Sequence, residues 1–210
     1  MVRLNTVHGE SLSGGAYGQG GIAMGQGFAP GGLLCREDAV LVVVDVQKRL
    51  APAIAECDRV VASIVKLLRF ARIAELPVLC TEQIKLGDTV DEIRAELPGI
   101  TPIQKAEFGC FGCAEFVEAL WNLGRRTLVL TGIEAHICVL QTALGALPDY
   151  AVHAVADAMS SRALENRDLA LRRMLHAGVT VTSTEMVMYE VLRRAGTDEF
   201  RAVLQLVKQS

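Results

Sequence analysis

Residues 40–44 form an unbroken aliphatic run of four valines and one leucine. A run of this length is typical of a strand buried on both faces, as in a parallel sheet between two helical layers. Similar runs alternate with helical apolar spacing from residue 37 onward. The predicted strands are 40–44, 77–81, a short strand or turn after 102, 127–131, 151–156 and 179–182. The predicted helices are 59–75, 89–97, 114–123, 137–146, 166–177 and 184–195. This alternation predicts an α/β fold, a three-layer αβα sandwich with a mainly parallel sheet.

The first 32 residues differ in composition from the rest of the chain. They hold ten of the nineteen glycines and have no apolar periodicity. Such a segment cannot bury enough surface to offset its ordering entropy. We therefore expect a flexible, glycine-rich arm over residues 1–32 and one domain over residues 33–210, which is ample for a real core.

Charge and hydropathy exclude several classes of partner. With 21 basic and 24 acidic residues the net charge is −3, so the chain has no excess of positive charge with which to bind nucleic acid. The longest apolar run, residues 39–44, is too short to cross a membrane. No secretion leader opens the chain, so a cytoplasmic location is expected. Six scattered cysteines are too few for a disulfide scaffold.

Two charged residues follow predicted strands, where ligands of parallel sheets bind. Asp45 comes directly after the first strand; it is either a loop or capping aspartate, or a general base whose pKa is raised by desolvation. If the strand continues, the Gln47 side chain faces the same way as that of Asp45. Lys105 alone would be a surface residue, and it gains a role only if the sheet brings it beside Asp45 and a nucleophile.

Cys138 lies at the predicted first turn of the helix that follows strand 127–131. Backbone N–H groups and the helix dipole favour anions there, so the position predicts a depressed thiol pKa and a nucleophile. The alternative is a buried cysteine that packs the helix onto the sheet.

Several motifs together carry a family resemblance. They are residues 42–47 around Asp45, 81–83, 104–108 around Lys105, 131–142 around Cys138, and 157–162. Over residues 37–194 the chain resembles the isochorismatase-like cysteine hydrolase superfamily, in the branch of isochorismatase domain-containing proteins. The resemblance implies a Cys–Asp–Lys triad that hydrolyses a C–N (amide-like) or ester bond of a small molecule. Cys138 would form an acyl-thioester, Asp45 would carry the proton, and Lys105 would be the electrostatic partner.

The resemblance also implies a non-proline cis peptide at Ile133–Glu134. This bond would aim the N–H groups of Glu134 and Cys138 at the developing oxyanion. The expected substrate pocket comprises Gln47, Gln83, Phe108, Phe111, Ile133 and His136. The two phenylalanines are expected to line the substrate side of Lys105. A turn histidine bonded to the backbone is the other interpretation of His136.

The sequence also departs from relatives in this superfamily. Nicotinamidases place histidine ligands for a metal in the middle of the domain, and residues 82–100 contain no histidine. We therefore expect no catalytic metal and no cofactor, and nicotinamide is a doubtful substrate. The isochorismate-cleaving enzymes generally lack the nucleophilic cysteine, so Cys138 argues against vinyl-ether cleavage.

Other interpretations stay open. Cys110 and Cys113 form a C-x-x-C pair that a thiol redox protein or a zinc site could use. Cysteine phosphatase chemistry is excluded, because position 143 is alanine where an arginine is needed. A catalytically idle scaffold is a further alternative. Self-association into a homo-oligomer is expected through residues 184–206, with Met186, Val187, Tyr189 and Val191 as candidate contacts.

Overall fold

A computed structural model describes residues 32–208. All but the last residue of the predicted arm therefore lies outside the described residues. The strands are β1 (Ala39–Val44), β2 (Val78–Gln83), β3 (Ile103–Lys105), β4 (Thr127–Ile133), β5 (Ala151–Ser160) and β6 (Thr180–Thr182). They form one sheet in the order β3-β2-β1-β4-β5-β6, and every pairing is parallel.

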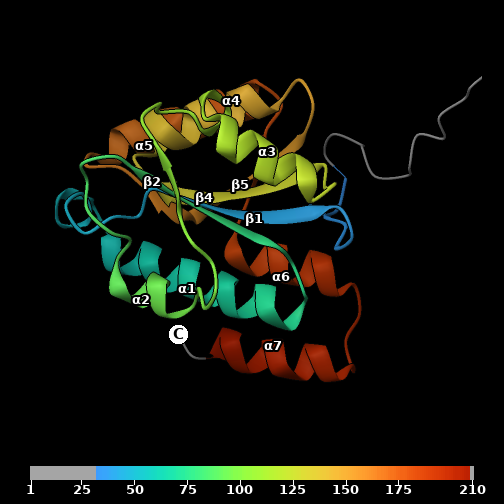
Figure 1. Cartoon of the computed structure of the whole chain (residues 1–210). Coiled ribbons are helices and arrows are strands. Elements are labelled where there is room, and N and C mark those ends of the chain that lie inside the picture. Colours follow the sequence, from blue (N-terminus) through green and yellow to red (C-terminus); the bar gives the residue numbers. More distant parts are fainter. Residues whose placement is uncertain (1–31, 209–210) are drawn as a thin grey trace, which may run out of the picture.

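Helices cover both faces of this sheet, as Figure 1 shows. They are α1 (Cys57–Ile73), α2 (Asp91–Ala95), α3 (Ala114–Asn122), α4 (Leu140–Ala146), α5 (Leu164–His176), α6 (Thr184–Leu192) and α7 (Asp198–Lys208), with short turns η1 (Ala51–Ala53), η2 (Cys110–Gly112) and η3 (Ala135–Val139). One layer contains α3, α4 and α5, and the opposite layer contains α1, α2, α6 and α7. The predicted three-layer αβα sandwich is confirmed.

Strand β1 lies at the centre of the sheet and is buried on both faces. Leu41 and Val43 face the core under α1, whereas Val40, Val42 and Val44 face the core under α3 and α4. Each buried valine stabilises the fold by about 1.5–3 kcal/mol. The register sets Val44 beside Thr81 of β2 and Gly132 of β4, so the residue after Val44 emerges between two neighbouring strand ends.

The chain contains one helix that the sequence analysis did not predict, α7. Its start is capped by Thr197, whose hydroxyl accepts a hydrogen bond from the Phe200 N–H at 3.0 Å. Acidic residues occupy the first turn, and Val203 is fully buried against α1. None of the helices between residues 32 and 208 has both the length and the apolar character needed to span a membrane.

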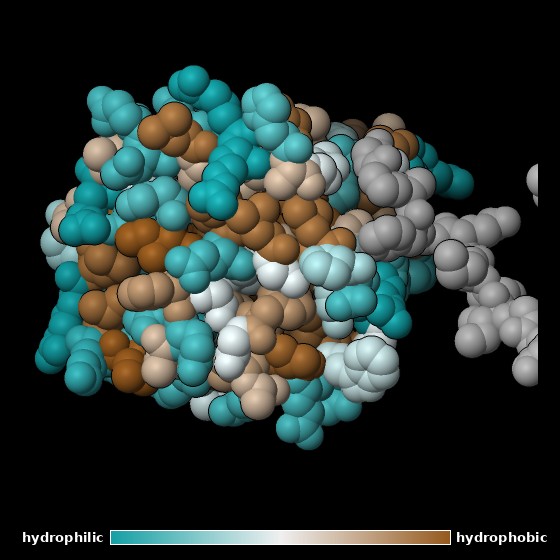
Figure 2. Space-filling model, turned by 90° about the horizontal axis from the view of Figure 1, so that it is seen from above, coloured by the Kyte–Doolittle hydropathy of each residue, from teal (hydrophilic) through white to brown (hydrophobic). Residues whose placement is uncertain are grey.

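The surface expected for self-association is largely internal. Val187 and Val191 are buried in the core under α6, and only Met186 and Tyr189 expose much of their side chains. Apolar side chains instead gather on the opposite layer, which Figure 2 views face-on. The exposed members there are Val117, Trp121, Leu164, Leu169 and Leu175, on α3 and α5.

Candidate active site

Asp45 is a fully buried carboxylate at the carboxyl end of β1. Its backbone takes the left-handed conformation, with φ of 54°, which is uncommon for a residue with a side chain. One carboxylate oxygen accepts the Thr81 hydroxyl at 2.8 Å, and the other accepts the Lys105 ammonium at 2.6 Å. Both ends of this ion pair are fully shielded from solvent.

Lys105 closes β3 and is surrounded by oxygen atoms. Besides Asp45, its Nζ donates to the Gln83 side-chain oxygen at 3.0 Å and to the backbone carbonyls of Glu107 and Phe108 at 3.1 and 3.0 Å. A buried ammonium needs such a complete shell, because an unpaired charge in the interior is strongly destabilising. The positive charge is therefore held in place beside the carboxylate.

Cys138 lies in the π-helical turn η3 that joins β4 to α4, and 5% of the residue is exposed. The negative charge of the Asp45 carboxylate acts on the thiol. Burial and then the Asp45 charge raise the pKa of Cys138 above its ordinary value, against a smaller opposing effect of Lys105. The prediction of a depressed pKa is wrong, because desolvation at this depth outweighs the dipole of one short helical turn.

Iodoacetamide should therefore alkylate Cys138 more slowly than free cysteine at pH 7, since the thiol is protonated there. The rate should keep rising above pH 8.5, roughly where free cysteine is half ionised. Peptide mapping of alkylated protein across pH measures this dependence. Asp45→Asn removes the negative charge and should shift the whole profile to lower pH. Rapid labelling at pH 7 with no response to Asp45→Asn would contradict this account of the thiol.

Glu134 makes the turn between β4 and Cys138. Its φ is also 54°, and every peptide bond among the described residues is trans. The expected cis peptide at Ile133–Glu134 is therefore wrong, because the left-handed backbone of Glu134 itself turns the chain. The buried carboxylate of Glu134 forms an ion pair with Arg162 and lies 3.4 Å from His136 Nδ1.

Two predicted pocket residues, Gln83 and Phe108, contact Lys105, and a third, Gln47, contacts Gln83. Gln47 is fully buried beyond the end of β1, and its side chain donates to the carbonyls of Gln83 and Gly87 and accepts the Gln83 N–H. It ties the last residue of β2 to the loop at Gly87 and does not extend β1. The Gln83 side chain in turn contacts Lys105, and Phe108 at the rim is 55% exposed.

The other predicted pocket residues are placed differently. The Phe111 ring packs against Phe116 and Tyr150, with ring centres 5.8 and 5.7 Å away, so its packing is with α3 and the end of α4 and not with Lys105. Ile133 is fully buried in the core under α1, so its assignment to the substrate pocket has no support from its packing and stays a prediction. His136 is partly exposed, and its Nδ1 lies 3.0 Å from the Ser161 hydroxyl, a side chain and not the backbone.

Two threonines belong to the site but were not singled out as site residues. Thr81 holds Asp45 from the neighbouring strand. The Thr142 hydroxyl donates to the Cys138 carbonyl at 2.7 Å and accepts the Cys110 N–H at 3.0 Å, which fixes η2 against the turn that carries Cys138. Thr81 could have been found from the sequence, because it ends the predicted strand 77–81. The role of Thr142 depends on tertiary packing alone.

The geometry does not favour a redox or zinc role for the C-x-x-C pair. Cys110 is fully buried, and burial raises the pKa of its thiol to about 11, the opposite of a reactive redox cysteine. Cys113 donates its thiol proton to the Gln104 carbonyl at 3.7 Å. Within residues 32–208 no cluster of three or more His, Cys, Asp or Glu side chains could hold a metal ion.

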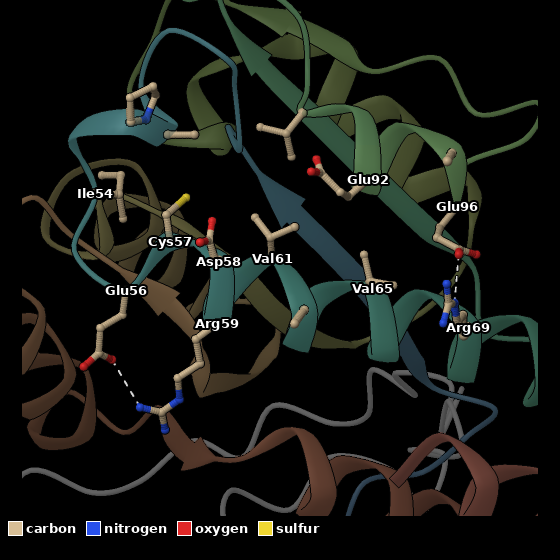
Figure 3. Close-up of a pocket in the computed structure, with 15 residues that line it drawn as sticks. Ile54, Glu56, Cys57, Asp58, Arg59, Val61, Val65, Arg69, Glu92 and Glu96 are labelled. Carbon is tan, nitrogen blue, oxygen red and sulfur yellow. Dashed lines mark hydrogen bonds and ion pairs between the residues drawn. The ribbon is translucent and has the colours of Figure 1, made fainter. Parts of the chain in front are cut away.

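A groove of about 1200 Å³ lies apart from these residues, between α1, η1 and α2 (Figure 3). Cys57, Val61 and Val65 of α1 line it, and ion pairs of Arg59 with Glu56 and of Arg69 with Glu96 lie at its edge. None of Asp45, Lys105 and Cys138 lines this groove. Its size therefore says nothing about the chemistry at the sheet edge.

Known proteins are similar to this chain in sequence and fold. The profile of the isochorismatase domain matches residues 39–186. Mouse isochorismatase domain-containing protein 2A is 33% identical over 85% of this chain and 86% of its own length. Two solved structures are similar in fold. The MAR1 ribonuclease from Caenorhabditis elegans has a TM-score of 0.79 and 31% identity, and it covers 85% of this chain and 94% of its own. YcaC from Pseudomonas aeruginosa, with hexane-2,5-diol and covalent acrylamide, has a TM-score of 0.77 and 26% identity over 83% of this chain and 91% of its own. With its parallel sheet and its family profile, this chain belongs to the isochorismatase family.

Proposed function

We propose that this protein is a cysteine hydrolase that cleaves a C–N (amide-like) or ester bond of a small molecule. Membership of the isochorismatase family points to a hydrolase. The observation that carries the mechanism is the buried ion pair of Asp45 and Lys105, 2.6 Å apart, whose two charges both act on the Cys138 thiol. A core has no packing need for two buried charges, which cost desolvation energy.

The three side chains divide the chemistry between them. As the Cys138 sulfur attacks the carbonyl carbon, its proton passes to Asp45. Lys105 stabilises the negative charge that develops on the sulfur as the proton leaves. Asp45 then gives this proton to the departing nitrogen or oxygen, which leaves an acyl-thioester. Water attacks the thioester, Asp45 takes the water proton, and the expelled thiolate recovers it as the acid departs. The N–H groups of Glu134 and Cys138 are the proposed oxyanion donors.

We test this function with intact-protein mass spectrometry against a panel of small amides and esters. Wild type should acquire acyl masses that Cys138→Ala does not, and the variant should lose hydrolysis. Cys57→Ala is the matched control, because Cys57 is a partly exposed thiol of the groove in Figure 3, away from the site. Hydrolysis by Cys138→Ala at the wild-type rate contradicts the proposal. Absence of any turnover by wild type favours an idle scaffold.

A small molecule is preferred to RNA as the substrate. The Caenorhabditis elegans relative is described as a ribonuclease, so RNA belongs in the same panel. The net charge of −3 and the complete burial of Lys105 leave little cationic surface for a phosphate backbone. The Pseudomonas aeruginosa relative, described with covalent acrylamide, supports covalent binding of a small molecule in this fold. Cys138-dependent RNA cleavage would overturn this choice of substrate.

Two further properties remain proposals. We propose that the protein is located in the cytoplasm and that it self-associates into a homo-oligomer. The face that now supports self-association is the one with the exposed apolar side chains of α3 and α5, where Trp121 is 67% exposed.

A further inference from the structure

The groove of Figure 3 combines apolar side chains with an excess of negative charge. Ile54, Val61, Val65 and Val90 line its volume of about 1200 Å³. The charged residues of its lining are four acids and two arginines, namely Glu56, Asp58, Glu92, Glu96, Arg59 and Arg69. A short apolar segment that carries a positive charge is the kind of occupant that suits this lining.

Two of the four acids have no cation beside them. The other two each pair with an arginine of the groove. Among residues 32–208 neither Asp58 nor Glu92 forms an ion pair. Asp58 extends from α1 and Glu92 from α2, on the two sides of the groove in Figure 3. Burial and the charges of both acids raise the pKa of the Cys57 thiol, so both acids act on the same part of the groove. A cation between them would be attracted by both.

Residues 1–8 of the chain have the composition of such an occupant, and they lie outside the described residues. Arg3 is the one residue of this segment that is charged at pH 7, and half of its residues are apolar, namely Met1, Val2, Leu4 and Val7. All ten glycines of the predicted arm lie in residues 9–32. By composition the arm therefore divides into a short apolar, cationic segment and a glycine-rich linker.

The linker is long enough to bring this segment to the groove. Leu34, just after the linker, is fixed to the end of α6: its N–H donates to the Glu190 carboxylate at 3.0 Å, and its carbonyl accepts a hydrogen bond from Arg193 at 2.6 Å. A glycine-rich linker of the length of residues 9–32 spans about 25–30 Å on average, whereas a domain of this size has a radius of gyration of about 16 Å. Tethering also raises the effective concentration of the segment to about the millimolar range, so a weak contact is enough.

We propose that residues 1–8 dock in the groove of the same chain, with their apolar side chains along α1 and with Arg3 between Asp58 and Glu92. The inference does not depend on the proposed hydrolase function, because none of the three proposed catalytic residues lines the groove.

The test uses Cys57 of the full-length protein, a partly exposed thiol that lines the groove. Iodoacetamide labelling at about pH 8.5, followed by peptide mapping, gives its alkylation rate. Cys35 is the internal reference, because it is partly exposed and lies outside the groove. Leu4→Ser should raise the Cys57 rate about tenfold, as expected if the segment covers the groove about nine-tenths of the time. Ile22→Ser, which changes an apolar residue of the linker, is the matched control and should leave the rate unchanged.

A charge exchange tests the position of Arg3. Arg3→Glu should speed Cys57 labelling about two- to fivefold, the size expected of an exposed charge interaction, because Asp58 and Glu92 repel the new carboxylate. In a background that carries Asp58→Asn and Glu92→Lys, the same Arg3→Glu change should slow labelling, because the two charges are again opposite. Each comparison holds the groove constant, so direct effects of the groove variants on the thiol divide out.

Three results would overturn the inference. The first is an equal Cys57 rate in wild type and Leu4→Ser, and the second is an equal response to Ile22→Ser. The third is protection of Cys57 that disappears on dilution, which would assign the groove to the segment of a second copy and not to that of the same chain. None of these results bears on the hydrolase function, which is tested through Cys138.

Discussion

Lys105→Met should lose both folding stability and activity. The substitution leaves Asp45 as a buried carboxylate without its cation and removes the donor from the oxygens of Gln83, Glu107 and Phe108. Breaking a buried ion pair on one side costs about 3–5 kcal/mol of unfolding free energy. Hydrolysis should fall by about 10²–10³-fold, because a fixed charge at the reacting atoms is lost. Urea unfolding and steady-state rates measure the two losses.

A double variant separates the two effects. Asp45→Asn combined with Lys105→Met removes both charges, and asparagine still offers an oxygen to the Thr81 hydroxyl. The double variant should recover much of the lost stability, because no uncompensated charge remains, yet it should stay inactive without a base. Recovery of activity together with stability would show that the pair serves folding alone and that Asp45 is not the base.

Gly132→Ala should be among the most destabilising single substitutions in the sheet. Gly132 has φ of +139°, and a Cβ there would lie 2.2 Å from the Val44 carbonyl oxygen and 2.9 Å from the Val44 Cβ. Both atoms belong to the neighbouring central strand, which cannot move without displacing Asp45. Overpacking and backbone strain together should cost about 4 kcal/mol or more. Urea unfolding, or the soluble yield if folding fails, measures the effect.

Gly124→Ala is the control for backbone conformation alone. Gly124 has φ of +63° after α3, and a Cβ added there would meet nothing within 4 Å. This substitution should cost only about 1 kcal/mol, the strain of a left-handed alanine. If the two alanine variants are equally stable, the close approach of β1 and β4 at Gly132 is not what requires glycine there.

Much of the fold was readable because its signals are local. The aliphatic run at residues 40–44 gives β1 to within one residue, and strand–helix alternation gives the layers. Helix α7 was missed although its signals are present in Thr197, two acidic residues and the apolar spacing from Phe200. The last residues of β2 and β5 were not predicted as strand. Polar residues there are covered by neighbouring strands, and the hydropathy pattern of the sequence does not indicate this.

The candidate site was readable in part. Asp45, Lys105 and Cys138 follow strands in the sequence, and the structure gathers them at one sheet edge, although their catalytic roles remain predictions. The direction in which the pKa of Cys138 shifts could not be predicted from the sequence, because it depends on burial and on a carboxylate from another strand. The ion pair of Arg162 with Glu134 likewise could not be predicted, because the two residues meet only when β4 and β5 pair.

Asp45 and Glu134 both leave their strands in a left-handed conformation that glycine or asparagine would adopt at lower cost. At Asp45 such a replacement would leave the buried Lys105 ammonium unpaired, at a cost of about 3–5 kcal/mol that exceeds the relieved strain, so a screen for heat resistance alone would be expected to enrich replacements at Glu134 only. Such proteins would be more stable but would lose the carboxylate that holds Arg162 beside the turn that carries Cys138. Thermostabilisation of this protein is best sought elsewhere, at positions whose backbone serves no reaction.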